Sequence, residues 1–322
     1  MLFRFGDVVM PAIAEVAKKN SVSFYWHLGD LRLGTDVDED IKNAPQYRTR
    51  PMTVSQYLNG MWPDFIENQI KPFGSIPFMV GIGNHEVAIK TRDEFLIQFA
   101  DWLNMPVLQQ QRLKDDPTDH RMKTYYHWIQ NGVDFIFLDN ASNDQFLPAQ
   151  MLWFNRTLQR AIANPAVTTI VAGMHKALPS GFNTHSMDES GTSIDTGRQV
   201  YAALLRAQNQ GKKKVYVLAS HQHNYSEEEA YDTEYWREHG GVLPGWIVGT
   251  AGAVRVPIVN PAMQHSITDV YGALLGTVLP GGEITFAFQR VNEWDTPDPV
   301  MTKYGRPFVH WCYTENKAAI LQ

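Results

Sequence analysis

Cysteine is almost absent from this 322-residue chain, because Cys312 is its single cysteine and no disulfide can form within it. The chain also lacks an apolar run of about 18 residues, so a membrane-spanning helix is not expected. Neither sign of charge is in large excess, with 28 Lys and Arg against 34 Asp and Glu. These features exclude a disulfide scaffold and give no sign of a standing nucleic-acid or anionic-membrane partner.

The low cysteine content suits a reducing compartment, so the sequence as given predicts a cytoplasmic protein. The chain opens directly in strand-like sequence at residues 1–5. A periplasmic or secreted protein whose N-terminal signal is missing is therefore the alternative.

Short apolar runs alternate with amphipathic segments along most of the chain. The runs are rich in β-branched and aromatic residues, end in glycine or polar residues, and are expected to be buried strands. They cover residues 2–5, 22–28, 76–82, 133–138, 168–172 and 215–219. Amphipathic helices are expected at residues 11–19, 150–162 and 199–209. The polar stretch 32–60 has no clear period and is interpreted as an insertion over one edge of the sheet.

From Gly245 onward the pattern changes to short apolar runs separated by turns. Runs at residues 246–248, 253–256, 273–278 and 284–290, with Pro-Gly-Gly at 280–282, predict an antiparallel sheet with tight turns. We therefore expect a layered α/β fold, in which helices cover the sheets. Residues 1–322 are expected to form one catalytic domain whose end, 245–322, is rich in β-structure.

Residues that bind metals follow most of the expected strands. These are Asp7, Asp30, Asn84, His85, His175, His221 and His223. Ligand sites of sheet enzymes form beyond the carboxyl ends of adjacent strands, so these side chains are expected to meet there. Carboxylate, amide and imidazole ligands together suit Mn, Fe or Zn, and the lack of thiolates argues against a structural zinc site. Two metals held about 3.5–4 Å apart would require a bridging carboxylate.

The ordered motifs resemble those of the calcineurin-like metallophosphoesterase superfamily, to which the purple acid phosphatases are related. The motifs are Gly6-Asp7, Gly29-Asp30, Gly-Asn-His-Glu at 83–86, the lone His175, and Ser-His-Gln-His at 220–223. A weaker match is the Trp-Ile-Val-Gly-Thr-Ala-Gly segment at 246–252. The resemblance implies two packed β-sheets flanked by helices in a four-layer sandwich. It also implies hydrolysis of a phosphate ester by a hydroxide that bridges two metal ions.

The resemblance implies a role for each motif residue. Asp30 would bridge the two metals, and His85 would donate a proton to the leaving group or stabilise the transition state. One metal would be completed by Asn84, His175 and His221, and the other by Asp7 and His223. Glu86 is expected to hold the loop through hydrogen bonds behind the ligands.

The first motif departs from the family pattern. The chain has Asp7-Val8-Val9 where the family has Asp-x-His, and Leu33 where purple acid phosphatases have a metal-binding Tyr. Either Asp7 is a ligand and water fills the gap, or the first motif lies upstream and Asp7 caps a helix.

Several alternatives remain open at the level of function. The incomplete first motif allows a metal-poor or catalytically weak protein that binds phosphorylated ligands, and a metal amidase or peptidase is disfavoured because His-Glu-x-x-His is missing. The motifs do not select among monoesters, diesters, nucleotides and phosphoproteins, and they leave the oligomeric state open. The polar segment 179–191 is either a surface loop or a lid, in which His185 would contact substrate.

Overall fold

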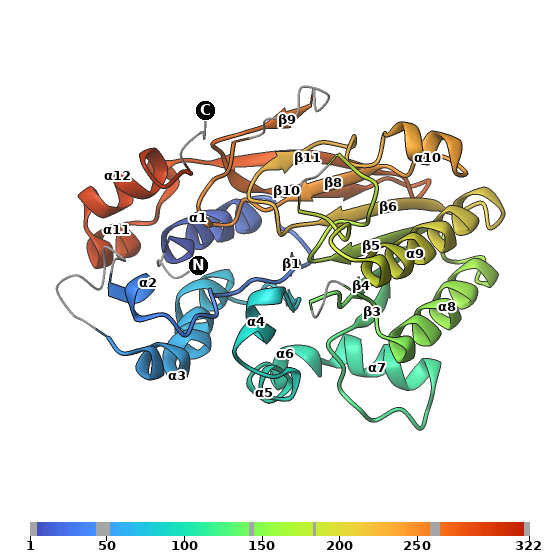
Figure 1. The fold of residues 1–322 in the computed structure, drawn as a ribbon, viewed down its shortest axis with the longest axis horizontal. Helices are drawn as coiled ribbons and strands as arrows, with labels where there is room; N and C mark the ends of the chain where they lie inside the picture. Colours follow the sequence, from blue (N-terminus) through green and yellow to red (C-terminus); the bar gives the residue numbers. More distant parts are fainter. Residues whose placement is uncertain (1–4, 43–51, 142–144, 183–184, 258–264, 319–322) are drawn as a thin grey trace.

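The computed structural model describes residues 5–42, 52–141, 145–182, 185–257 and 265–318 (Figure 1). Its largest element is a sheet of seven strands in the order β3-β4-β5-β6-β8-β7-β9. Their bounds are Tyr126–Gln130 (β3), Val133–Leu138 (β4), Thr169–Met174 (β5), Lys214–Ala219 (β6), Gly245–Val248 (β8), Tyr225–Ser226 (β7) and Ser266–Ile267 (β9). Strands β4, β5, β6 and β8 are parallel to one another, and the remaining pairings are antiparallel.

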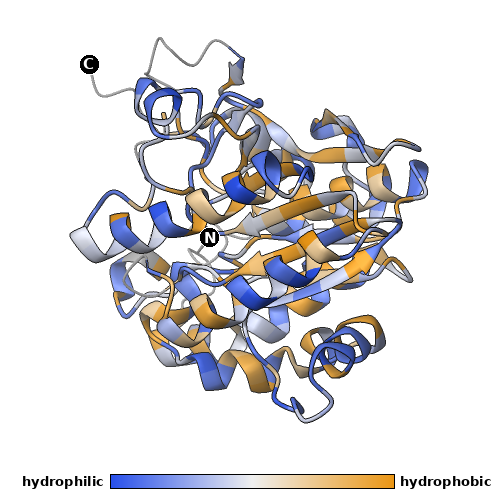
Figure 2. Cartoon of the chain, turned by 90° about the vertical axis from the view of Figure 1, so that its right-hand side faces the viewer, coloured by the Kyte–Doolittle hydropathy of each residue, from blue (hydrophilic) through white to orange (hydrophobic). Residues whose placement is uncertain are grey.

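The central strands of this sheet are buried on both faces. In β4, Phe135 and Phe137 belong to one hydrophobic cluster, whereas Ile136 and Leu138 belong to another. The second cluster also includes side chains of α8 (Pro148–Ala163) and α9 (Gly191–Asn209), which cover that face. This burial on both faces explains why β4 is apolar apart from Asp134. Figure 2 shows the same distribution, with hydrophobic colour on the strands and hydrophilic colour on the outer helix faces.

The other face of the large sheet is covered by a second layer of strands. Strands β1 (Tyr25–His27) and β2 (Phe78–Val80) form a parallel pair, and β10 (Tyr271–Val278) and β11 (Ile284–Val291) form an antiparallel pair. Helix α1 (Gly6–Lys19) packs outside β10 and β11. The order helix, sheet, sheet, helix agrees with the expected four-layer arrangement, although the described strands of the second layer form two separate pairs.

The remaining helices surround these layers. They are α2 (Asp38–Lys42), α3 (Val54–Phe65), η2 (Ile66–Ile70), η3 (Lys71–Phe73), α4 (Asn84–Ala88), α5 (Arg92–Gln98), α6 (Ala100–Leu103), α7 (Pro106–Asp115), α10 (Glu234–Glu238), η4 (Glu293–Asp295), α11 (Asp298–Tyr304) and α12 (Arg306–Thr314). No helix in the described ranges combines the length and the apolar character needed to cross a bilayer.

The strand expected at residues 2–5 is not formed at Phe5, the one residue of it that the structure describes. Residues 2–4 of the expected first strand lie outside the described residues, and Phe5 forms a turn that leads directly into α1. The ring of Phe5 packs against Phe308 and Trp311 of α12, which fixes the turn away from the β-layers. Asp7 therefore lies in the first turn of a helix and does not follow a described strand.

Two expectations for the C-terminal part were also wrong. Residues 253–256 form no strand, because Arg255 is buried and its guanidinium donates to the carbonyl oxygens of Asp269, Tyr313 and Asn316. The part after β11 is helical, in α11 and α12, so the β-rich character ends at Val291. The polar stretch 32–60 contains α2 and the start of α3, and its residues 43–51 lie outside the described residues.

Candidate metal centre

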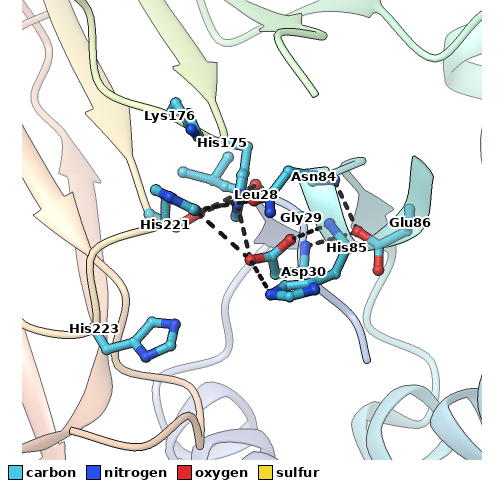
Figure 3. A network of polar contacts seen from close by, with 12 residues as sticks. Leu28, Gly29, Asp30, Asn84, His85, Glu86, His175, Lys176, His221 and His223 are labelled. Carbon is cyan, nitrogen blue, oxygen red and sulfur yellow. Dashed lines mark hydrogen bonds and ion pairs between the residues drawn. The ribbon is translucent and has the colours of Figure 1, made fainter. Parts of the chain in front are cut away.

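Four of the expected ligands lie at the carboxyl ends of parallel strands. Asp30 follows β1, Asn84 follows β2 and begins α4, His175 follows β5, and His221 follows β6. Because β1 and β2 form one parallel pair and β5 and β6 another, the four loops open toward the same region between the layers. Figure 3 shows the side chains of Asp30, His175 and His221 pointing toward one another.

The ring of His175 is at the centre of this cluster. Its Nε2 lies 3.0 Å from Asp30 Oδ2, 2.9 Å from Asn84 Oδ1 and 2.9 Å from His221 Nδ1. Ligand atoms of Asp30, His175 and His221 all lie within 4.8 Å of one another, and the described residues offer no other such group of three or more. This spacing is suited to a single cation among them.

The hydrogen bonds of His175 indicate that a positive charge belongs at this point. Its Nδ1 lies 3.0 Å from the carbonyl oxygen of Leu28, which can only accept, so Nδ1 carries a proton. In neutral His175 the Nε2 lone pair then faces the oxygens of Asp30 and Asn84. Three electron-rich groups converge there, and either a proton on Nε2 or a metal ion is needed to hold them together.

The electrostatics of the cluster agree with this interpretation. Burial acts to raise the pKa of Asp30, but the charge of His175 and hydrogen bonds to His175 and His221 outweigh it, so that pKa lies well below its usual range. Burial acts to lower the pKa of His175, yet the charge of Asp30 raises it overall. For His221, burial dominates and the pKa is lowered. Asp30 is therefore ionised and His221 neutral near pH 7, which are the forms that bind metals.

The backbone at two of these residues lies in the left-handed region. Asp30 has φ +58° and His221 has φ +30°, which few residues other than glycine adopt. Such conformations cost free energy and are common where a side chain must be aimed at a site. Gly83 is needed for a related reason, because a methyl group there would collide with the Asp30 carboxylate.

Glu86 joins the two loops that carry Asp30 and Asn84. Its fully buried carboxylate accepts hydrogen bonds from the main-chain N–H groups of Asp30, Leu31 and Gly83, each at 2.8 Å. Burial, followed by the charge of Asp30, raises the pKa of Glu86 to about 7. The expectation that Glu86 holds the loop by hydrogen bonds behind the ligands agrees with these contacts.

The structure does not bring Asp7 into this cluster. Its Oδ1 accepts from Arg32 Nη2 at 2.5 Å and from Gln69 Nε2 at 3.0 Å, and its Oδ2 accepts from the Tyr304 hydroxyl at 2.9 Å. Asp7 and Arg32 are both buried, so they form an internal ion pair. Nor is Asp7 a helix cap, because α1 has no side-chain cap. Sequence reasoning missed Arg32, whose one local signal is its place two residues after Asp30.

His223 also stands apart from the cluster in Figure 3, where no hydrogen bond or ion pair is drawn between it and the other labelled residues. Its Nδ1 donates to the carbonyl oxygen of Val254 at 2.8 Å, so its Nε2 carries the lone pair. Burial lowers the pKa of His223 to about 4, which keeps the ring neutral at physiological pH. It is thus in a form that can bind a metal.

The remaining candidates flank the cluster. His85 Nε2 lies 4.0 Å from Asp30 Oδ2, and burial lowers the pKa of His85. The exposed ring of His185 lies 5.9 Å from that of His221, measured between centroids, so the 179–191 segment reaches the site. Residues 183–184 of this segment lie outside the described residues.

Comparison with protein families agrees with the motifs. The model of the calcineurin-like phosphoesterase family matches residues 7–225, more than half of the chain. This chain belongs to the calcineurin-like phosphoesterase family. The structure of purple acid phosphatase PPD1 from yellow lupin (Lupinus luteus) seeds is similar to this family member, with a TM-score of 0.54 and 15% identity over 88% of the chain.

That similarity establishes the fold alone, and the present chain spans 47% of the lupin phosphatase. GAP50, described as the anchor in the inner membrane complex of Plasmodium, aligns over 98% of this chain and 93% of its own, with 12% identity and a TM-score of 0.45. Comparison with curated protein sequences found no match.

Proposed function

We propose that this member of the calcineurin-like phosphoesterase family is a metal-dependent hydrolase of phosphate esters. The observation that carries the proposal is the convergence of Asp30 Oδ2, Asn84 Oδ1 and His221 Nδ1 on the Nε2 lone pair of His175. Asp30 Oδ2 is buried, and its neighbours in the described part of the chain include the ring nitrogens of His175 at 3.0 Å and His221 at 3.8 Å, which donate to it only when they are protonated. A buried carboxylate oxygen in that state is costly unless a cation neutralises it.

These residues fit a metal ion of the Mn, Fe or Zn type. Asp30, Asn84, His175 and His221 would hold it, and both imidazoles present unprotonated nitrogens when the ion replaces the proton on His175. When bound, such a cation stabilises negative charge on the oxygens of a phosphate ester. Asp7 is occupied by Arg32, so its expected part in a second metal site has no support in the contacts.

The surrounding side chains supply the rest of the chemistry. His85 lies 4.0 Å from the same carboxylate, and it would give a proton to the departing alcohol oxygen. His185 lies beside His221 at the surface, where a substrate would enter. We take the substrate to be a small-molecule or nucleotide phosphoester, without a standing nucleic-acid or membrane partner.

A second candidate function has one observation in its favour. If Asp7 stays paired with Arg32 and His223 remains apart, the chain binds one metal and holds a phosphorylated ligand without turning it over. This is the metal-poor alternative, and it shares the Asp30 cluster with the first proposal.

One experiment separates the two candidates. The purified protein is loaded in turn with Mn²⁺, Zn²⁺ or Fe²⁺, its metal content is measured, and hydrolysis of aryl phosphate monoesters and diesters is followed. Metal-dependent turnover that a chelator removes and added metal restores supports the hydrolase. Stoichiometric metal and tight phosphate binding without turnover for either ester class support the binding protein instead.

A further inference from the structure

A cavity of about 440 Å³ lies beside β3, the edge strand of the large sheet, and none of the described residues that line it belongs to the metal cluster. Its walls come from α7, from α8 and from the loop that joins α7 to β3. The two helices lie side by side in Figure 1, and Arg160 of α8 joins them at one end. Its Nη2 donates at 3.0 Å to the carbonyl oxygen of Asp115, the last residue of α7.

Positive side chains predominate in this cavity, although the whole chain has a formal net charge of −6. Five of the lining residues are Arg or Lys and three are Asp, namely Arg112, Arg121, Lys123, Arg156, Arg160, Asp115, Asp116 and Asp119. A local excess of one sign of charge attracts ligands of the opposite sign. Whether these charges are available to a ligand depends on the partners that each group already has.

The three carboxylates of the cavity are already used within the protein. Asp115 is paired with Arg160, and Asp119 is paired with Lys123. The third carboxylate, that of Asp116, accepts a hydrogen bond at 2.9 Å from a main-chain N–H group of its own turn. In the described part of the chain, none of the three therefore forms an ion pair with the remaining guanidinium groups of the cavity.

Three guanidinium groups that line the cavity have no carboxylate partner among the described residues. They belong to Arg112, Arg121 and Arg156. Arg112 donates to neutral oxygens, which are Asn104 Oδ1 at 2.6 Å and the Asp119 carbonyl oxygen at 3.2 Å. Burial lowers the pKa of Arg112, and the charge of Asp119 offsets only part of this effect. Positive charge that the fold leaves without a counter-charge favours the binding of an anion from solution.

Apolar and aromatic side chains lie next to these guanidinium groups. On α8, Leu152 is 55% exposed, and the ring centroid of Trp153 lies 4.9 Å from that of Tyr125 in the loop before β3. Arg156 follows these two α8 residues at spacings of four and three, so the apolar groups and the charge share one face of the helix. A ligand that fills the cavity would therefore contact apolar surface and positive charge together.

We propose that this cavity binds a ring-bearing organic phosphate, whose ring lies against Leu152 and Trp153 and whose phosphate is bound by the three guanidinium groups without a carboxylate partner. The planar guanidinium group matches the geometry of phosphate oxygens, and hydrogen bonds between charged groups are the stronger ones. Inorganic phosphate would leave the apolar side uncovered, whereas an uncharged ring would leave the guanidinium groups without a counter-charge. Small-molecule sites combine largely apolar walls with a few polar groups that fix the ligand, as this cavity does.

The test uses naphthylphosphonate, whose phosphorus–carbon bond a phosphoesterase does not hydrolyse, and the purified, metal-loaded protein. Hydrogen–deuterium exchange is followed as the probe is added, because it reports on each part of the chain separately. We expect exchange in α7, in α8 and in the loop between α7 and β3 to slow, and the concentration that gives half of the effect defines a Kd for the cavity.

Two further probes separate the parts of the ligand. Methylphosphonate has the charge without the ring, and naphthylmethanol has the ring without the charge. Each should protect the cavity with a Kd at least about tenfold higher than that of naphthylphosphonate, because each leaves one side of the cavity without its contacts. Equal binding of either probe overturns the proposal.

A matched pair of variants tests the guanidinium groups. Arg156→Gln removes an exposed guanidinium that lines the cavity, and the Kd should rise by roughly tenfold. Arg206→Gln removes the same charge from an exposed position of α9 outside the cavity and should leave the Kd unchanged. An unchanged Kd in Arg156→Gln combined with Arg121→Gln overturns the proposal. So does an equal loss in Arg206→Gln, because binding would then follow the overall charge alone.

His175→Ala separates this cavity from the proposed metal centre. The variant should leave the protection of α7 and α8 unchanged, since none of the described residues that line the cavity belongs to the centre. Loss of that protection in His175→Ala, with no effect of the arginine substitutions, would assign the probe to the metal centre and overturn the proposal. Failure of the proposed hydrolase function does not affect these readouts, because none of them measures turnover.

Discussion

The two sides of the candidate centre differ in what stands behind their side chains. Asp30, Asn84, His175 and His221 each follow a strand that is paired in parallel with a neighbour, and Glu86 ties the loops of Asp30 and Asn84 together. Asp7 instead lies in the first turn of α1, held by Arg32. Paired strands fix the position of the residue that follows them. The side chain of Asp7, in the first turn of a helix, is instead oriented by the nearest cation, Arg32.

This difference has a consequence for charge. On the strand side, the ionised Asp30 lies against the ring of His175, so a positive charge is present there only when His175 is protonated or a metal ion is bound. On the helix side, the guanidinium of Arg32 neutralises Asp7 and also contacts Asp64 at 2.8 Å. One side is therefore prepared for a cation and the other already contains one.

Asp30→Asn is expected to abolish metal-dependent hydrolysis and metal binding while the protein stays folded. The change removes the carboxylate charge that attracts the cation but keeps the side-chain shape. Activity is expected to fall by more than about 100-fold, because even the mutation of residues that only support metal ligands lowers metal affinity or activity by about 10- to 100-fold. Metal content, turnover and circular dichroism are measured together.

His175→Ala and His221→Ala should give the same result as Asp30→Asn. His239→Ala, an exposed histidine remote from the strand ends, serves as the matched control and should keep full activity and metal. Full activity in His175→Ala or His221→Ala would remove that residue from the centre. The strand side would then not be the metal site that its contacts indicate.

His85→Ala is expected to lower turnover by about 10²–10⁴-fold with metal retained, because it removes a proton donor and not a ligand. Esters with good leaving groups need less proton donation, so their loss should be smaller. Rates are compared across aryl phosphates of graded leaving-group pKa. An equal loss for every ester would exclude proton donation and leave only charge stabilisation for His85.

The sequence predicted the strand side of the centre well for a physical reason. Strands buried on both faces, such as β4, are largely apolar in sequence, and residues 133–138 match its bounds. The helices expected at 150–162 and 199–209 lie within α8 and α9, because their apolar spacing is local. Since ligands of parallel strands share an edge, placing the strands also placed Asp30, His175 and His221.

The helix side could not be predicted in this way, because its contacts come from distant parts of the chain. Tyr304 donates to Asp7 from α11, and Phe5 is held by α12. No local pattern near Asp7 indicates these partners. The strand expected at residues 253–256 was wrong for a similar reason. Arg255 lies in a mostly apolar run but donates to carbonyl groups from other segments.

Asp7→Ala is expected to destabilise the protein by about 3 kcal/mol, since it leaves buried Arg32 without its nearest counter-charge. Metal content should not change. Asp64→Ala removes the other, more exposed partner of Arg32 and should cost about 1 kcal/mol or less. Both are measured by denaturant unfolding beside metal analysis. Loss of metal in Asp7→Ala without loss of stability would show that Asp7 is a metal ligand.

A second buried ion pair, formed by His127, gives a comparison for the structural role of Asp7, because histidine titrates and arginine does not. His127 contacts Asp134 Oδ1 at 2.7 Å and also Asp115, and Asp115 is faced in turn by Gln111 at 3.1 Å and Arg160 at 3.5 Å. Burial acts to lower the pKa of His127, but both carboxylates outweigh it and raise that pKa to about 9. A raised histidine pKa means that the folded protein holds the proton more tightly than the unfolded chain.

The stabilisation from His127 should therefore be fully present below about pH 6.5, the unfolded value, and be lost as the pH rises through about 9. Melting temperatures of the wild type and of His127→Gln are compared from pH 6 to 10, so that other titrating groups cancel in the difference. The difference should shrink above about pH 6.5 and level off above about pH 9, whereas that between wild type and Asp7→Ala should not, because Arg32 keeps its charge throughout. A His127 difference that stays constant from pH 6 to 10 would show that its proton contributes nothing to folding.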